Sequence, residues 1–329
     1  MQRLLLALAL ICSSVISVAA ETPVVSQPKT LPSSAGNDES KLWLARMQEA
    51  LNSSNFQISY IHMQLDQIRA FRYQHGLIDG EQVAFLEHLN GPLKSSARVG
   101  NKVIYLEQDT KPYSVTSDRI PGIMPGAFAG GLLELDGHYR FVLGGRNRIA
   151  GHSAQLIRIV AADQYRYQYR VWMDAETAIP LRIDLLDTDN NLLEQLLVIE
   201  HHRFNDASPL LHELRAQQWP AVVTAPESPQ THPWRFGWLP SGFEVRHYDQ
   251  HLLIGLNEPV EYLAVSDGLN DFSVYIGRVG QVQLPTNISS GNGLSLASAR
   301  HGEFEVVAVG RMPVESLQNV AENLYPATQ

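Results

Sequence analysis

Apolar and polar side chains alternate along many short stretches in the first two thirds of the chain. Examples are "FQISYIHMQL", "EQVAFLEHL", "AQLIRIVAAD" and "YRYQYRVWM". Alternation with a period of two, repeated between polar turns, is typical of antiparallel strands that bury one face. Gly100-Asn101 and Asn190-Asn191 lie between such runs and are typical turn residues. The pattern predicts a large antiparallel sheet.

A helical pattern precedes these strands. In "SKLWLARMQEALNSSN", Leu44, Met47 and Leu51 fall on one side of a helix, and the polar residues 52–54 end it. One helix followed by many strands predicts a curved sheet or half-open barrel wrapped around the helix.

A second domain is predicted after a break in this pattern. The stretch "WPAVVTAPESPQTHP", residues 219–233, contains four prolines and predicts a linker. Alternating runs resume at Trp234, and Pro313 opens a closing helix with an apolar stripe of Val314, Leu317, Val320, Ala321 and Leu324. We therefore expect domains at residues 41–218 and 234–329.

The first twenty residues, "MQRLLLALALICSSVISVAA", have the layout of a secretory signal peptide. Arg3 precedes an apolar run, and small residues precede the expected mature start at Glu21. A membrane anchor is the alternative, but the run is shorter than the roughly 20 apolar residues that span a bilayer. Residues 21–40, rich in Pro, Ser and Thr, predict a disordered leader.

Cysteine content and charge narrow the function further. The only cysteine, Cys12, lies in the predicted signal peptide, and the bulky Ile11 before it argues against acylation as a lipoprotein. The mature chain would have no disulfide and no thiolate nucleophile. It carries 24 basic and 34 acidic side chains, a formal charge of −10, which gives no electrostatic footprint for nucleic acid.

Catalytic motifs are missing from the sequence. It contains no phosphate-binding P-loop, dinucleotide-binding glycine motif, H-E-x-x-H or G-x-S-x-G. Asp174 and Glu176, in "RVWMDAETAIPLRIDLLD", are the acids most suggestive of a catalytic pair. They lie between two alternating runs and just before Pro180, where turn residues are common. We interpret them as the solvated turn of a hairpin.

The histidines do not predict a metal site. His201 and His202 are adjacent on a predicted strand, so their side chains point to opposite faces and cannot readily bind one ion. His247 and His251 would share a face on a helix, but their segment predicts a strand. We therefore predict no catalytic residue, no metal and no cofactor.

Several blocks of the mature chain, in order, resemble the RseB/MucB family of periplasmic regulators of the envelope-stress sigma factor. They are "FRYQHGLIDGE", "LNGPLKSSARVGNKVIYLE", "FVLGGRNRIAGHSAQLIRIVAADQYRYQYRVWMDAETAIPLRIDLLDTDNNLLEQ", "WLPSGF", "SDGLNDFSVYIGR" and "VAVGRMPVESLQNVAENL". The resemblance extends over nearly all of the mature chain.

The resemblance implies an α+β protein. Its N-terminal domain would be an unclosed antiparallel β-barrel of the LolA/LolB lipoprotein-carrier type with helices at its mouth, followed by a smaller C-terminal α/β domain. The implied activity is binding. Such a protein holds the periplasmic domain of a single-pass anti-sigma factor of the RseA/MucA type, protects it from regulated proteolysis, and is released by lipopolysaccharide or lipoprotein acyl chains. Family members can also form homo-oligomers. A periplasmic lipid or lipoprotein carrier is the alternative.

Lipid-binding candidates come from two segments. The apolar stretch "IPGIMPGAFAGGLLEL", residues 120–135, is broken by Pro and Gly and suits a flexible lid over an acyl cavity. Its candidates are Met124, Phe128, Leu132 and Leu133; the alternative is a buried loop that packs on the core. Arg72, in "FRYQH", is a candidate for a lipid phosphate, and a solvated sheet face is its alternative.

Partner-binding candidates lie in the second domain, which the resemblance implies is the main holder of the anti-sigma factor. They are Trp238, Leu239, Pro240 and Phe243 of "WLPSGF". Aromatic anchors suit such an interface. The alternative is a turn in which Trp238 and Phe243 fix the start of the small domain's core.

Overall fold

The computed structural model describes residues 34–64, 67–223, 231–251, 258–279 and 286–327. The predicted signal peptide and the leader as far as residue 33 lie outside these residues, as do positions 224–230 of the predicted linker. Among the helices described, none has the length and apolar character needed to cross a bilayer.

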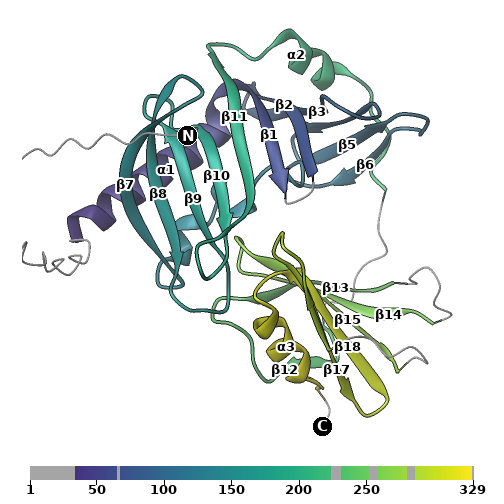
Figure 1. The fold of residues 1–329 in the computed structure, drawn as a ribbon. Coiled ribbons are helices and arrows are strands. Elements are labelled where there is room, and N and C mark those ends of the chain that lie inside the picture. Colours follow the sequence, from purple (N-terminus) through teal and green to yellow (C-terminus); the bar gives the residue numbers. More distant parts are fainter. Residues whose placement is uncertain (1–33, 65–66, 224–230, 252–257, 280–285, 328–329) are drawn as a thin grey trace, which may run out of the picture. The chain divides into compact units, whose positions relative to one another are not determined.

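Most of the chain up to residue 204 forms one antiparallel sheet that curves around helix α1 (Figure 1). Its strand order is β6-β5-β4-β3-β2-β1-β11-β10-β9-β8-β7. The edge strands β6 and β7 are not paired with each other in the described part of the chain, so the predicted unclosed sheet is confirmed. The strands are β1 Asn55–Gln64, β2 Gln67–Ile78, β3 Glu81–His88, β4 Lys94–Val99, β5 Lys102–Glu107, β6 Tyr113–Thr116, β7 Tyr139–Ile149, β8 His152–Ala161, β9 Gln168–Asp174, β10 Pro180–Leu186 and β11 Leu192–Phe204.

Helix α1, Ser34–Ser53, packs on the inner face of this sheet. Leu44, Met47 and Leu51 are buried, as their spacing predicts. The helix begins at Ser34, so the prediction of a disordered leader as far as residue 40 was wrong for residues 34–40. The early start was missed because the first residues, "SAGNDE", carry no apolar periodicity. The Ser40 hydroxyl donates to the carbonyl of Phe141 at 2.9 Å and ties the helix to β7.

A second, short helix covers the opposite face of the sheet. Helix α2, Pro209–Ala216, buries Leu211 and Leu214 against a cluster that includes Val83 and Ile104. Trp219, expected as the first linker residue, packs on the same cluster, and its indole N–H donates to the carbonyl of Leu214 at 2.8 Å. The sheet therefore buries apolar side chains on both faces over β2 to β5.

The remainder of the chain forms a separate, smaller domain. Its antiparallel sheet has the order β13-β14-β15-β18-β17-β16, and helix α3, Val314–Glu322, packs on β17 and β18. Leu317, Val320 and Ala321 are buried, which confirms the predicted closing helix. Leu324, the last residue of the predicted stripe, is buried but lies in a strand beyond the end of the helix. The strands are β12 Trp234–Phe236, which pairs with β19 Leu324–Pro326, and β13 Glu244–His251, β14 Val260–Ser266, β15 Asp271–Arg278, β16 Asn287–Ser289, β17 Leu294–His301 and β18 Phe304–Arg311.

The segment around Asp174 is the predicted hairpin, with its turn between β9 and β10. One oxygen of the Asp174 carboxylate accepts the backbone N–H groups of Glu176 and Thr177 at 2.8 and 2.7 Å. Glu176 is exposed, but Asp174 is only 2% exposed, so the expectation that both acids are solvated was wrong. The backbone donors explain the burial, because they replace water around the carboxylate.

Candidate ligand cavity

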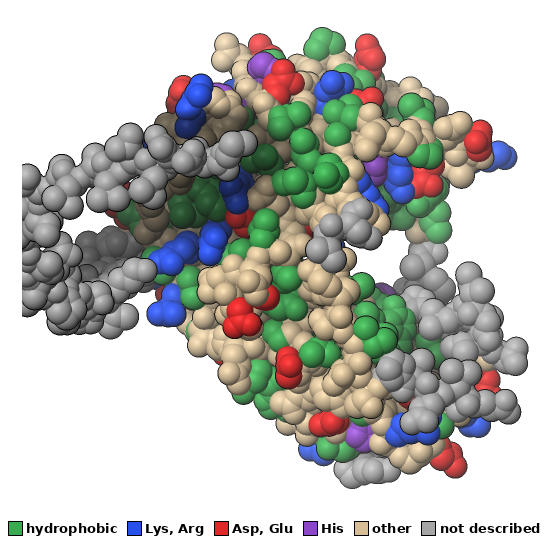
Figure 2. All heavy atoms as spheres, viewed as in Figure 1, with side chains coloured by type: hydrophobic (Ala, Val, Ile, Leu, Met, Phe, Trp, Pro, Cys, Tyr) green, Lys and Arg blue, Asp and Glu red, His purple; other side chains and the backbone are tan. Residues whose placement is uncertain are grey.

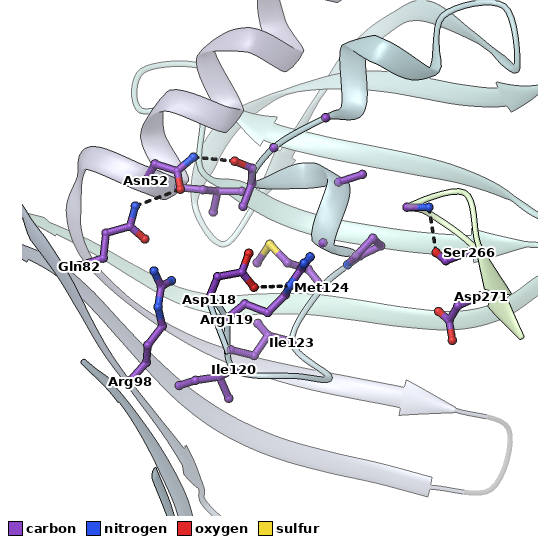
Figure 3. A pocket seen from close by; sticks show the side chains of 18 of the residues that line it. Asn52, Gln82, Arg98, Asp118, Arg119, Ile120, Ile123, Met124, Ser266 and Asp271 are labelled. Carbon is purple, nitrogen blue, oxygen red and sulfur yellow. Dashed lines mark hydrogen bonds and ion pairs between the residues drawn. The ribbon is translucent and has the colours of Figure 1, made fainter. Parts of the chain in front are cut away.

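A cavity of about 880 Å³ opens between the large sheet, the end of α1 and the segment of residues 118–135 (Figure 3). Its volume lies within the range of about 300–1,000 Å³ that is common for ligand pockets. Tyr73, His75, Gln82 and Arg98 line it from β2, β3 and β4. Residues of the C-terminal domain complete the wall: Arg246, and Ser266, Asp267, Gly268 and Asp271 at the turn between two strands. The cavity is therefore built from both domains.

Hydrogen bonds hold the cavity wall together on the side of α1. The Asn52 amide donates to the carbonyl of Ala129 at 2.7 Å, and the Gln82 amide donates to the Asn52 side-chain oxygen at 3.1 Å (Figure 3). These bonds join α1, β3 and the segment 118–135. Arg98 contributes a positive charge beside them, with its Nε donating to the carbonyl of Gly100 at 2.8 Å.

Two aromatic side chains of β2 are kept uncharged in this wall. Burial lowers the pKa of His75, although its Nδ1 donates to the carbonyl of Ser54 at 2.7 Å. Burial also raises the pKa of Tyr73 to about 12, against the opposing effect of Arg98. At neutral pH, the positive charge on this side of the cavity therefore comes from arginine rather than from histidine.

A second cavity, of about 510 Å³, lies on the other side of residues 120–126. Its apolar lining includes Phe71, Leu86, Ile183, Leu185 and Leu196 of the large sheet. Charged and polar side chains at its edge include His62, Arg69, His88, Glu194 and Arg311. Residues Ile123 to Gly126 line both cavities, so this part of the segment is a wall that the two cavities share.

The four apolar lipid-binding candidates of the segment 120–135 occupy different environments in the structure. Met124 is half-buried and lines both cavities. Phe128 and Leu132 are fully buried in the main core, where Phe128 makes an edge contact with Tyr169. Leu133 is partly buried against the same core. The alternative of a loop packed on the core therefore describes Phe128 and Leu132, while a lipid contact of Met124 stays a prediction.

Arg72 lies on the face of β2 opposite Tyr73 and His75, and its guanidinium pairs with Glu87 at 3.2 Å. This position agrees with its alternative, a solvated sheet face. Sequence reasoning missed Arg98, which lines the first cavity together with Arg119 and Arg246. For the β2 side of the cavity a signal was present, because in "FRYQH" Tyr73 and His75 share the parity of the buried Phe71.

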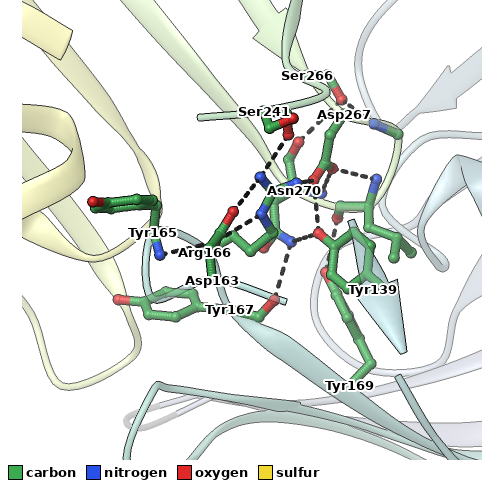
Figure 4. Close-up of polar contacts among 12 residues, drawn as sticks. Tyr139, Asp163, Tyr165, Arg166, Tyr167, Tyr169, Ser241, Ser266, Asp267 and Asn270 are labelled. Carbon is green, nitrogen blue, oxygen red and sulfur yellow. Dashed lines mark hydrogen bonds and ion pairs between the residues drawn. The ribbon is translucent and has the colours of Figure 1, made fainter. Parts of the chain in front are cut away.

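A buried polar network joins the large sheet to the C-terminal domain (Figure 4). Its centre is Arg166, in the loop between β8 and β9, which is 1% exposed. Its guanidinium pairs with Asp163 at 2.7 Å and with Asp267 of the C-terminal domain at 2.8 Å. It also donates to the carbonyl of Ser241 at 2.6 Å. Phe243 lies under the same guanidinium, with its ring centre 5.0 Å away.

Tyrosine and asparagine side chains complete the network. The Tyr139 hydroxyl donates to Asp267 at 2.6 Å and accepts from the Asn270 amide at 2.7 Å. Burial, followed by the proximity of Asp267, raises the pKa of Tyr139 well above its usual range. The Tyr169 hydroxyl donates to the carbonyl of Leu269 at 2.9 Å. Each of these bonds crosses between the two domains.

The cavity wall is attached to the same loop of the C-terminal domain. The backbone N–H of Ala127 donates to the carbonyl of Gly268 at 3.3 Å. At the second cavity, Arg311 of β18 pairs with Glu194 of β11. Burial opposes ionisation of Glu194, but hydrogen bonding by His62 and the charge of Arg311 prevail and lower its pKa. A ligand that displaced residues 123–127 would therefore disturb contacts with the second domain.

The residues of the block "WLPSGF" make contacts with other parts of the same chain. Trp238 makes an edge contact with Tyr165 of the first domain, with ring centres 5.1 Å apart. Phe243 is buried in the small domain's core beneath Arg166, Leu239 packs on that core, and Pro240 is buried. These positions agree with the alternative of a turn that fixes the small domain's core, and a partner contact stays a prediction.

Hydrophobic side chains reach the surface of both domains (Figure 2). Exposed examples are Ile68, Leu93 and Ile199 in the first domain and Ile288, Leu294 and Phe304 in the second. Apolar side chains at the surface are common, so they do not by themselves identify a docking surface.

Comparison with known proteins extends over almost the whole described chain. The family profile for the MucB/RseB N-terminal domain matches residues 39–223, and the profile for the MucB/RseB C-terminal domain matches residues 228–325. The sigma-E factor regulatory protein RseB of Escherichia coli K12 is 32% identical over 283 residues, which are 85% of this chain and 89% of that protein. The sigma factor AlgU regulatory protein MucB of Pseudomonas aeruginosa is 25% identical over 293 residues, 86% of this chain and 90% of that protein.

A solved structure shows the same fold. The MucA/MucB complex of Pseudomonas aeruginosa matches with a TM-score of 0.68 and 23% identity, and the match covers 88% of this chain and 99% of that chain.

Proposed function

The chain belongs to the MucB/RseB family, and we propose that it is a periplasmic negative regulator of an envelope-stress sigma factor. In this proposal it binds the periplasmic domain of a single-pass anti-sigma factor of the MucA/RseA type and protects that domain from regulated proteolysis. Lipid signals release it. The names of its relatives, which are sigma-factor regulatory proteins, and the fold it shares with MucB in the MucA/MucB complex support this role.

The observation that carries the proposal is the shared wall of the two cavities. Residues 123–126 line both cavities, and Ala127 is hydrogen-bonded to Gly268 of the C-terminal domain. A ligand in either cavity would thus touch a segment that also holds the second domain. This arrangement suits a sensor better than a simple carrier, which needs no second domain.

The chemistry of the cavities fits an anionic lipid. The apolar lining of the second cavity, with Phe71, Ile183 and Leu196, suits an acyl chain. Arginine side chains, Arg98 at the first cavity and Arg69 at the second, suit a phosphate or carboxylate group. Lipopolysaccharide combines acyl chains with phosphate groups, whereas lipoprotein acyl chains would use the apolar lining alone.

The mechanism is linkage between two ligands. If lipid favours a domain arrangement that holds the anti-sigma segment poorly, lipid and partner must weaken each other by the same factor. Lipid shifts the equilibrium only as far as its affinities for the two arrangements differ. Binding alone accounts for this activity, and we propose no catalytic step.

The test is calorimetry of the protein with the periplasmic segment of the organism's MucA-type anti-sigma factor, repeated after saturation with lipopolysaccharide. A matched pair of variants sharpens it. Met124→Trp adds bulk to both cavities, while Leu93→Trp makes an equal addition of bulk at an exposed leucine outside them. We expect Met124→Trp to keep partner binding and to lose most of the effect of lipid, and Leu93→Trp to behave as the wild type.

Two outcomes would contradict the proposal. Failure of the wild-type protein to bind the partner segment, with uptake of lipid retained, would favour a lipid or lipoprotein carrier. Binding of the partner that lipid leaves unchanged would remove the sensor role.

A further inference from the structure

Three side chains from separate strands converge at one end of the large sheet, away from the two cavities. His152 begins β8, Asp174 ends β9, and His201 lies near the end of β11. One donor atom from each, two imidazole nitrogens and a carboxylate oxygen, lie within 4.8 Å of one another. The antiparallel register produces this convergence, because Ala154 pairs with Asp174 and the β9–β10 turn lies at the same end.

His201 is the member of this cluster with the fewest hydrogen-bond partners. Its side chain is 8% exposed, and neither ring nitrogen has a hydrogen-bond partner within the part of the chain that the structure describes. A buried polar group without a partner costs free energy and requires an explanation. An imidazole nitrogen without a hydrogen-bond partner is open to a metal ion.

Asp174 and His152 supply the remaining donors. The turn fixes the Asp174 carboxylate, because one of its oxygens accepts two backbone N–H groups. Its other oxygen lies 2.9 Å from Nδ1 of His152. The His152 side chain is 41% exposed, which gives an ion a path from solvent. Such hydrogen bonds behind a ligand orient it and support metal binding.

We propose that His152, Asp174 and His201 form a binding site for a Zn²⁺ ion, with water completing the coordination. Two imidazole nitrogens and one carboxylate oxygen are a donor set that zinc prefers. Bond lengths of about 2.0–2.2 Å put the donors of a tetrahedral site roughly 3.5 Å apart, so the cluster closes by a small movement of the half-exposed His152. The ion joins the ends of β8, β9 and β11. An ion pair between His152 and Asp174 alone would leave the burial of His201 unexplained.

The site uses only one of the two adjacent histidines, and this supplies a matched control. His202 is the next residue on β11, is half-exposed, and pairs with Glu200 at 3.0 Å. The experiment uses the chain from Glu21 onward, purified without a polyhistidine tag. Zinc is titrated in competition with a chromogenic chelator, and native mass spectrometry counts the bound ions. The variants are His201→Gln, His152→Gln and His202→Gln, each checked by circular dichroism.

We expect one zinc ion to bind to the wild type and to His202→Gln with the same affinity. His201→Gln and His152→Gln should bind at least about tenfold more weakly. If His201→Gln fails to fold, His152→Gln decides the test, since its side chain is half-exposed. The site is excluded if the wild type binds no zinc at micromolar concentrations. It is also excluded if His152→Gln binds zinc as tightly as the wild type, because the ion then lies on other histidines.

Discussion

The large sheet holds two clusters of buried ionisable side chains, and they differ in how completely they are satisfied. Around Arg166, the guanidinium, the Asp267 carboxylate and the Tyr139 hydroxyl all have close partners. Around His201, Asp174 is satisfied by its turn, while both nitrogens of His201 lack partners among the described residues. A cluster in which every polar group has a hydrogen-bond partner (a saturated cluster) holds parts of a protein together. A cluster with polar groups that lack partners (an unsaturated cluster) can still bind a ligand. We therefore assign the first to domain contact and the second to ion binding.

The largest effect should come from breaking the saturated cluster. Arg166→Met leaves Asp267 buried without its charge partner, and loss of one member of a buried ion pair costs about 3–5 kcal/mol. The free energy of unfolding in urea should fall by this amount. Arg158→Met, at an exposed arginine of β8, is the control and should change stability little. A loss below about 1 kcal/mol for Arg166→Met would show that the network does not hold the domains.

Acid should lower the stability of the protein through two buried histidines, His75 and His201. Burial lowers the pKa of both His75 and His201. Below a pH of about 6.5 the unfolded chain binds protons that these folded histidines refuse, so the free energy of unfolding falls as the pH falls. The Glu194 carboxylate, whose folded pKa is lowered, contributes in the same direction only at more acidic pH. Urea unfolding at pH 7.5 and pH 5.5 measures the slope, and an increase in stability at pH 5.5 would contradict the assignment.

The smallest effect should come from removing the unsatisfied imidazole. His201→Leu, measured with a chelator present, should leave the free energy of unfolding unchanged or raise it by up to about 1 kcal/mol, because no hydrogen bond is lost. It should also flatten the pH slope. His75→Leu is the matched control, since it loses a hydrogen bond to the carbonyl of Ser54 and should destabilise. Equal losses in the two variants would mean that His201 has a partner in solution.

The architecture could be predicted from local sequence patterns, because the spacing of apolar side chains along the chain distinguishes strands from helices. The alternating runs gave the unclosed sheet, and the stripe through Leu317, Val320 and Ala321 gave the closing helix. The start of α1 at Ser34 was not predicted, since its first turns lack apolar residues. A helical segment without a repeating apolar pattern cannot be recognised from the sequence in this way.

The sites were less predictable because they depend on distant contacts. Arg166 and Asp267 are 101 positions apart, and each lies in a polar loop that resembles an ordinary turn. Sequence reasoning considered His201 only together with its neighbour His202 and predicted no metal site. His201 nevertheless meets His152 and Asp174, because three strands end at the same edge of the sheet. Only the register of the strands reveals that meeting.

The central claim is that lipid in the cavities and the partner on the protein weaken each other. The most direct measurement is the reverse of the partner titration: lipopolysaccharide is titrated into the protein by calorimetry, with and without saturating anti-sigma segment. The account predicts that the partner weakens lipid binding by the same factor by which lipid weakens partner binding, typically about 5- to 150-fold for coupled sites. Identical lipid affinities in the two titrations, with the partner still bound, would contradict it.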